Sequence, residues 1–346
     1  MYDSLIPLLY GPGASSFEAA RYFENEVVNA FRNKLDARIS VPTYPQLRDM
    51  NETFLDQLSG IRKEKQGWVV TGPLYVSSDR LKIPEVEVVR RNSFATNDSV
   101  DGPIRLRVCI TGPYTLSSFF PKRDSELFTN IGRILSRFAA ENTFSSKDVV
   151  VQILAIDEPV LGFLSDSLLD PGSDGREELM AAWECICREA KVRGAEPLIH
   201  LHDTSTALFW EVEGLKHIES HVGDALYQSS QVRSQCERYD KFIKASIAIT
   251  DFEYLVRRKV SETSSSKANL PEVVAKTWTA INKGKIDSAD FLDSKIVMKK
   301  RLEKIIDLFG VERVVLAGPE CGLKSFPTRQ CAVEYLRQIA EVTSTF

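Results

Sequence analysis

The sequence predicts a single (β/α)8 barrel, a TIM barrel that takes up residues 1–346 as one domain. Apolar segments rich in Val, Ile and Leu alternate with amphipathic segments, and no low-complexity linker divides the chain. Such alternation is typical of parallel strands that crossover helices bury on both faces. It is compatible with a closed barrel and with an open, doubly wound sheet, so the positions of the polar residues must decide between them.

Nine apolar segments are candidates for strands, one more than a barrel needs. The clearer candidates are residues 105–113, 149–159, 196–203, 242–252 and 313–320. The weaker candidates are residues 5–13, 37–45, 67–73 and 215–222. Part of the 37–73 region is therefore expected to form a loop or hairpin outside the barrel.

Amphipathic stretches between these segments predict helices over residues 16–35, 124–142 and 176–194, where apolar residues recur at helical spacing. The polar residues 261–268 are expected to form an exposed loop. Helices should follow that loop and cross back to the last strand.

The composition is that of a globular protein with a buried core, because 43% of the residues are hydrophobic and 27% are charged. A net charge of −4 argues against a nucleic-acid partner, and the basic run 299–301 is expected to be a solvated helix face. No stretch is long enough to span a bilayer, and the N-terminus lacks the basic region of a signal peptide. The six cysteines show no disulfide spacing, so we expect a cytoplasmic protein without a membrane partner.

Polar residues that could carry chemistry fall at the ends of several predicted strands. They are Asp157, His200, His202, Glu219 and Cys321. A barrel collects catalytic groups from the carboxyl ends of many strands, whereas an open sheet concentrates them at one switch point. No G-x-G-x-x-G follows a strand and no phosphate-binding Gly-rich loop is present, so the barrel is the better prediction.

All four histidines lie within a span of 22 residues, at positions 200, 202, 217 and 221. His200 and His202 share a face of their strand because side chains at i and i+2 point the same way. Two imidazoles so placed suit Zn²⁺, which takes nitrogen, sulfur and oxygen donors in tetrahedral geometry. Hydrogen-bonded histidines of the core or rim are the alternative, and the spacing alone does not decide between the two.

Glu219 and Cys321 are the further candidate ligands. Strand alternation places His217, Glu219 and His221 on one face, and only one or two of these can reach a common metal. Cys321 follows an apolar strand, and Gly322 lets the backbone turn sharply there. A lone cysteine is more often an inert apolar residue, but its place among the strand-end polar groups favours a ligand.

Several blocks of the sequence resemble the conserved blocks of the catalytic barrel of cobalamin-independent methionine synthase, in the same order and at similar spacing. They are TYPQLRDMNETFL, TGPYTLSSF, ILAIDEP, LIHLH, HIES and GPECGLK, between Val41 and Pro327. The last block is the most specific one. The chain is thereby similar to a short core form of that superfamily.

The resemblance implies a zinc site made by His200, Glu219 and Cys321. His202 stands where the family has a cysteine, so one thiolate fewer would leave the zinc more Lewis-acidic. An alternative alignment makes His202 the first ligand and places Thr204 in the cysteine position, but Thr is a poor zinc ligand.

The resemblance also implies how the substrate is held. Asp157, with Glu158 beside it as a second catalytic candidate, resembles the residue that binds the substrate amino group. A carboxylate that caps the next helix is the alternative for this pair. The family's G-S-x-P loop is not matched, and Ser15 and Ser16 are the nearest candidates to bind the substrate carboxylate.

The activity implied is zinc-dependent transfer of a methyl group to the thiol of homocysteine, which forms methionine. The family's full-length enzymes carry a second barrel that helps to bind folate, and this chain has no room for it. Methylcobalamin or a methylated corrinoid protein is therefore the expected methyl donor.

Two alternatives stay open. One is methyl transfer to another thiol such as coenzyme M, as in the methylcobamide:coenzyme M methyltransferases of the same superfamily, which also includes uroporphyrinogen decarboxylase-like proteins. The other is a non-catalytic zinc-binding relative.

Overall fold

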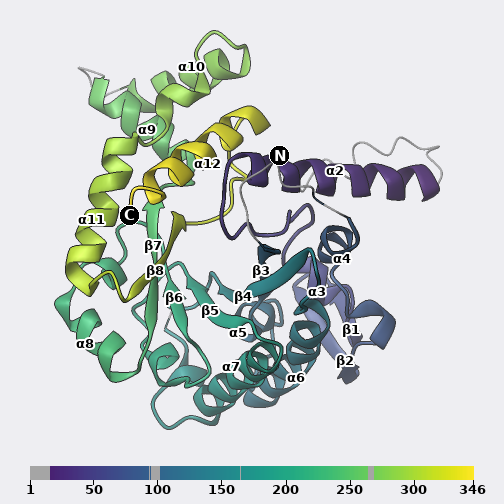
Figure 1. Cartoon of the computed structure of the whole chain (residues 1–346). Coiled ribbons are helices and arrows are strands. Elements are labelled where there is room, and N and C mark those ends of the chain that lie inside the picture. The colour runs from purple at the N-terminus through teal and green to yellow at the C-terminus, as the bar shows by residue number, and fades with distance from the viewer. Residues whose placement is uncertain (1–15, 93, 95–101, 164, 264–268) are drawn as a thin grey trace.

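A parallel sheet of six strands, in the order β3-β4-β5-β6-β7-β8, forms the centre of the computed structural model (Figure 1). The structure describes residues 16–92, 94, 102–163, 165–263 and 269–346. The strands are β3 (Ile104–Thr111), β4 (Val149–Glu158), β5 (Glu196–Leu201), β6 (His217–Glu219), β7 (Phe242–Ala248) and β8 (Val314–Pro319). Each strand lies beside its sequence neighbour, and the helices between them cover the outer side of the sheet (Figure 1). The α/β class is thus as predicted, and six of the eight expected barrel strands form one parallel sheet in the described part of the chain.

The register of the strands lines up polar residues at their carboxyl ends. Thr111 pairs with Asp157, Asp157 with His200, and His200 with Glu219, so four neighbouring strands contribute to one row. Residues of one row in a parallel sheet point to the same side. The register therefore brings Asp157, His200 and Glu219 together although they are far apart in the sequence.

The predicted helices are present in the structure. The described α-helices are α2 (Ser16–Asp36), α3 (Glu52–Leu55), α4 (Pro84–Arg91), α5 (Pro113–Ser117), α6 (Ser125–Asn142), α7 (Asp174–Val192), α8 (Ser230–Arg238), α9 (Phe252–Thr263), α10 (Leu270–Asn282), α11 (Lys295–Phe309) and α12 (Arg329–Thr343). Side chains cap several of them: Asp124 accepts from the N–H of Leu127 at the start of α6, and Ser173 accepts from that of Arg176 at the start of α7. No helix of the described ranges is long and apolar enough to cross a membrane.

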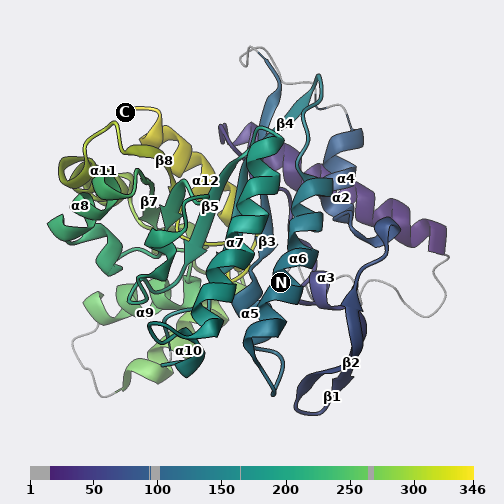
Figure 2. The ribbon, with the colours of Figure 1, turned by 90° about the horizontal axis from the view of Figure 1, so that it is seen from below.

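The 37–73 region contains the expected element outside the sheet. Strands β1 (Ser59–Glu64) and β2 (Gly67–Tyr75) pair with each other in an antiparallel hairpin that projects from the body of the molecule (Figure 2). The 37–45 candidate is not a full strand: within it, Thr43 forms an isolated parallel bridge with Arg107 of β3. This bridge extends the sheet beyond β3 by a single residue pair.

Two other predictions need comment. The prediction of a loop over 261–268 was wrong at its start, because α9 continues through Ser261 to Thr263 and buries Val260 on its apolar face. The remaining positions, 264–268, lie outside the described residues. The strand predicted over 5–13 lies outside the described residues.

Helices α6 and α7 pack closely side by side (Figures 1 and 2). A Cβ atom added at Gly132 of α6 would lie 2.3 Å from the Cβ of Ala182 in α7, closer than real carbon atoms approach. The absence of a side chain at Gly132 therefore permits this helix pair to approach.

We expect Gly132→Ala to destabilise the protein by about 1–3 kcal/mol, because overpacking outweighs the roughly 1 kcal/mol that Ala gains in a helix. Urea denaturation measures this change. Arg133→Ala, at the next and exposed position, is the control and should change stability by less than about 0.5 kcal/mol. Equal or greater stability of Gly132→Ala would contradict the packing.

Candidate metal centre

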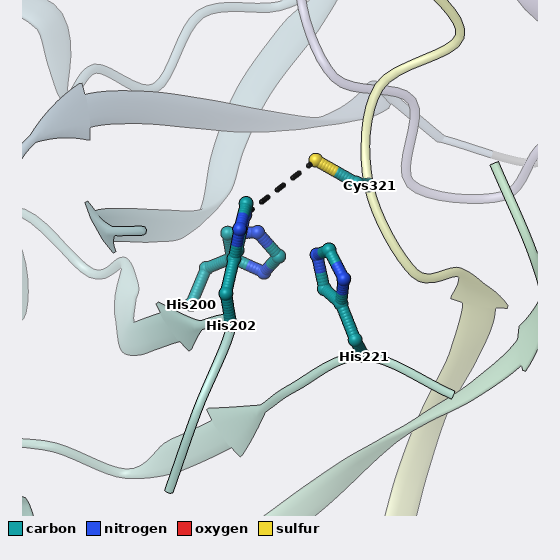
Figure 3. A group of neighbouring side chains, drawn as sticks. All are labelled: His200, His202, His221 and Cys321. Carbon is teal, nitrogen blue, oxygen red and sulfur yellow. Dashed lines mark hydrogen bonds between the residues drawn. The ribbon is translucent and has the colours of Figure 1, made fainter. Parts of the chain in front are cut away.

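Three histidines and one cysteine converge at the carboxyl ends of the strands. One ligand atom from each of His200, His202, His221 and Cys321 lies within 4.8 Å of the others (Figure 3). His200 belongs to β5 and His202 follows its end, His221 follows β6, and Cys321 follows β8. Segments far apart in the chain thus build one cluster.

The side chains of the cluster are in mutual contact. The Cys321 Sγ lies 3.9 Å from the Nε2 of His202 (Figure 3). The ring centroid of His202 lies 3.9 Å from that of His221 and 5.2 Å from that of His200. The Nε2 of His221 is buried and has no hydrogen-bond partner in the described part of the chain. Nitrogen and sulfur donors at these separations, with a buried nitrogen left unpaired, fit a zinc ion.

Glu219 lies beside this cluster, within a set of buried cations. Both guanidinium Nη atoms of Arg107 contact its two carboxylate oxygens. The Lys244 ammonium lies 3.0 Å from its Oε2, and the Nδ1 of His200 lies 2.9 Å from its Oε1. These cations, led by Arg107, outweigh burial and hold the pKa of Glu219 well below its ordinary value.

Glu320 joins the loops that carry the cluster. Its Oε2 accepts a hydrogen bond from the backbone N–H of Val222 at 2.9 Å, and its Oε1 accepts one from that of Thr250 at 2.8 Å. Val222 follows His221 and Glu320 precedes Cys321. One buried carboxylate therefore fixes the position of His221 relative to Cys321.

Asp157 and Glu158 point in opposite directions from the end of β4. The Oδ1 of Asp157 is buried without a hydrogen-bond partner among the described residues, and the nearest cation is Arg107 at 3.9 Å. Glu158 turns toward the outer helices, where it accepts hydrogen bonds from Thr115 of α5 and from the Trp183 indole of α7. Asp157 is thus available to a ligand, and Glu158 is engaged within the protein.

Sequence comparisons give relatives of one kind, although no family model matches the chain. The methionine synthase of Sulfolobus acidocaldarius is 22% identical over an alignment of 335 residues, which covers 93% of this chain and 81% of that protein. The 5-methyltetrahydropteroyltriglutamate–homocysteine methyltransferase of Salinibacter ruber is 27% identical over 153 residues, which cover 42% of this chain and 19% of that protein.

The solved structures that match the chain are of the same kind of enzyme as these relatives. The B12-independent methionine synthase of a Shewanella species matches with a TM-score of 0.61 and 12% identity, over 96% of this chain and 90% of that one. The chain resembles the cobalamin-independent methionine synthases. A further structure of this kind, from Listeria monocytogenes, matches with a TM-score of 0.60 and 13% identity, over 98% of this chain and 92% of that one. The resemblance predicted from the sequence is confirmed, and the fold is that of these methionine synthases.

The structure brings together three of the four ligands that the methionine synthase resemblance implies, namely His200, His202 and Cys321. Glu219 is close to them, but its oxygens contact Arg107, Lys244 and His200. The ligand assignments and the catalytic role of Glu158 stay predictions, and the contacts of Glu158 within the protein do not support that role.

Other residues that the sequence singled out lie elsewhere. The Nε2 of His217 lies 2.5 Å from Glu196, at the opposite end of the strands from the cluster. The Thr204 hydroxyl donates a hydrogen bond to Asp224. His202 is therefore the candidate metal ligand at this point of the site. Ser15 lies outside the described residues, and Ser16 begins α2 without a described side chain.

The charges of the cluster favour a thiolate. Burial alone would raise the pKa of Cys321, but the adjacent imidazoles of His200, His202 and His221 outweigh burial and hold that pKa well below its ordinary value. Burial lowers the pKa of His200, but the neighbouring Glu219 carboxylate and Cys321 outweigh it and raise that pKa to about 10. A polarised thiolate among imidazoles is a suitable donor for a soft-to-borderline metal ion.

Burial raises the pKa of Asp157 to about 6, against the lowering effect of His200 and Arg107. The folded protein therefore binds more protons than the unfolded chain between about pH 4 and pH 6, and stability falls as the pH rises through that window. In metal-free protein we expect Asp157→Asn to be more stable than the parent at pH 7.5, by up to about 3 kcal/mol.

That advantage should disappear at pH 4 and below, where the carboxyl group is protonated in both states. Thermal unfolding across pH 4–8 measures it. The matched control is Asp148→Asn, which changes an exposed aspartate. A variant that is less stable than the parent at pH 7.5 would show that the charge of Asp157 is satisfied within the protein.

Proposed function

We propose that the protein is a zinc-dependent methyltransferase that transfers a methyl group to the thiol of homocysteine and releases methionine. The observation that carries this proposal is the convergence of His200, His202 and Cys321 beside Asp157, whose Oδ1 has no hydrogen-bond partner among the described residues. The names of both curated relatives agree with this reaction. The Shewanella structure is a complex with selenomethionine, a selenium analogue of the proposed product.

Each part of the proposed site has a definite task. His200, His202 and Cys321 would hold the zinc ion, whose positive charge, when bound, favours the thiolate form of a substrate thiol at neutral pH. Asp157 would accept the substrate ammonium group through its free Oδ1, and this pairing fixes the distance of the sulfur from the cluster. The thiol proton would pass to solvent, and the sulfur would then form a bond to the methyl carbon as the bond between methyl and donor breaks, with the electron pair of that bond left on the donor.

The proposed methyl donor is methylcobalamin or a methylated corrinoid protein. With His202 in place of a second thiolate, the cluster donates less negative charge, so a bound sulfur is a weaker nucleophile. Such a site requires a donor with a good leaving group.

The proposal also covers the closure of the barrel and the compartment of the protein. We infer that the sheet closes into a full (β/α)8 barrel as one domain over residues 1–346, since β3 to β8 already have the sequential order of a barrel. A reducing compartment such as the cytoplasm suits the chain, because all six cysteines are free.

The zinc site leads to a direct test. We expect about one zinc per chain in the purified parent and a loss of affinity of at least about 100-fold in Cys321→Ala, since the thiolate donor is removed. Elemental analysis and competition with a chelator measure both quantities. Cys185→Ala, which changes a free cysteine of α7, is the matched control and should keep the parent's zinc. Full zinc affinity in Cys321→Ala would refute the assignment of Cys321.

The reaction leads to a second test. Zinc-loaded protein with methylcobalamin and homocysteine should form methionine, whereas methyltetrahydrofolate should give little or none. Asp157→Asn should raise the KM for homocysteine by roughly 10- to 100-fold, because loss of a buried charge partner costs about 2 kcal/mol or more. Mass spectrometry of the products, with coenzyme M as a competing thiol, measures this activity.

Methylation of coenzyme M alone would show that coenzyme M is the methyl acceptor in place of homocysteine. Stoichiometric zinc with no methylation of any thiol would favour the non-catalytic relative instead.

A further inference from the structure

We propose that His221 is the fourth metal ligand of this site, and that Glu219 positions His200 without binding the metal. The donor set would then be three imidazoles and one thiolate. This inference rests on the proposed zinc site, and it differs from the ligand set that the family resemblance implies for Glu219.

His221 is in position to bind a metal together with the other three donors. Its ligand atom belongs to the set that lies within 4.8 Å, and its ring lies 3.9 Å from that of His202, centroid to centroid (Figure 3). Its Nε2 is buried and unpaired among the described residues. A buried imidazole nitrogen without a partner is costly in a folded protein, and a metal ion would satisfy it.

The neighbouring loop holds His221 there by a separate interaction. The N–H of Val222, the next residue, donates to the Glu320 carboxylate at 2.9 Å, and Glu320 directly precedes Cys321. The two loops that carry the imidazole and the thiolate are therefore held next to each other by a bond within the protein.

Glu219 has no free oxygen for a metal. Its Oε1 contacts Arg107 and His200, its Oε2 contacts Arg107 and Lys244, and its side chain is 1% exposed. A turn of the carboxylate toward the cluster would separate it from two buried cations. A buried cation that loses its partner is strongly destabilising, so the observed pairing opposes metal binding by Glu219.

The contact with His200 gives Glu219 a different task. The Oε1 of Glu219 lies 2.9 Å from the Nδ1 of His200, an ion-pair contact outside hydrogen-bond geometry that favours a proton on Nδ1, and the other ring nitrogen, Nε2, is left for the metal. A carboxylate in this place fixes the orientation and the tautomer of a metal-binding histidine. Glu219 thus acts on the metal through His200.

The experiment uses the full chain loaded with Co²⁺, whose visible spectrum reports the coordination number and whose ultraviolet charge-transfer band reports thiolate ligands. We expect His221→Ala to change the visible spectrum and to weaken Co²⁺ binding by at least about 100-fold, with partial recovery on addition of imidazole. We expect Glu219→Gln, which removes the charge but keeps a side-chain oxygen, to destabilise the fold and to weaken Co²⁺ binding by about 10- to 100-fold, while the folded, Co²⁺-loaded variant keeps the parent's spectrum and stoichiometry. The matched control is His217→Gln, which changes a histidine at the far end of the strands and should leave the spectrum unchanged.

His221→Cys gives a second measurement if His221→Ala does not fold. This variant should about double the thiolate-to-cobalt charge-transfer absorbance per cobalt, because a second thiolate then binds the metal.

The proposal is overturned if Glu219→Gln alters the visible spectrum while His221→Ala does not, or if His221→Cys adds no charge-transfer absorbance. Either result, with Co²⁺ still bound by the parent, leaves the proposed methyltransferase activity intact. Binding through His221 without methyl transfer to any thiol would refute the activity alone. Failure of the parent to bind Co²⁺ or Zn²⁺ would overturn both.

Discussion

The buried carboxylate of Glu219 is the charge around which the end of the sheet is organised. It is the fourth member of the cross-strand row that begins at Thr111, and it pairs with Arg107 of β3 and Lys244 of β7 across the interior. Each of these charges would be costly to bury alone, so they specify one another's positions. Because Glu219 also contacts His200, the same set of charges that fixes the strands relative to one another orients the metal-facing histidine.

The buried carboxylates of the site are of two kinds, those that are paired with donors within the protein and one that keeps an oxygen without a hydrogen-bond partner. Glu158, Glu219 and Glu320 are buried carboxylates whose oxygens are paired with protein donors. Asp157 keeps a buried oxygen without a hydrogen-bond partner among the described residues, and burial raises its pKa to about 6. A buried carboxylate that lacks a hydrogen-bond partner is expected where a cationic group of a ligand binds, since the ligand supplies the missing partner.

Three neutral imidazoles and one thiolate around Zn²⁺ would leave a net charge of +1, from +2 and −1, which favours capture of a further thiolate. An incoming thiol must then either displace one donor or raise the coordination number to five.

The sequence predicted the elements of this molecule more completely than their contacts. Apolar runs and helical periodicity located the six strands of the sheet, and strand ends gave His200, His202 and Cys321, because these are local properties. The choice between Glu219 and His221 could not be predicted, since alternation places both on one face and the choice depends on Arg107, 112 residues away from Glu219 in the chain. Neither Arg107 nor Glu320 carried a local signal of its role.

Zinc K-edge X-ray absorption of the zinc-loaded protein, recorded with and without homocysteine, directly tests whether this cluster binds zinc and whether the zinc binds the substrate thiol. We expect a shell of nitrogen with one sulfur at about 2.3 Å in the free protein, and a second sulfur at that distance when homocysteine is present. A shell that contains no sulfur, or a sulfur count that homocysteine does not change, would contradict the claim that this cluster binds the metal and that the metal binds the substrate thiol.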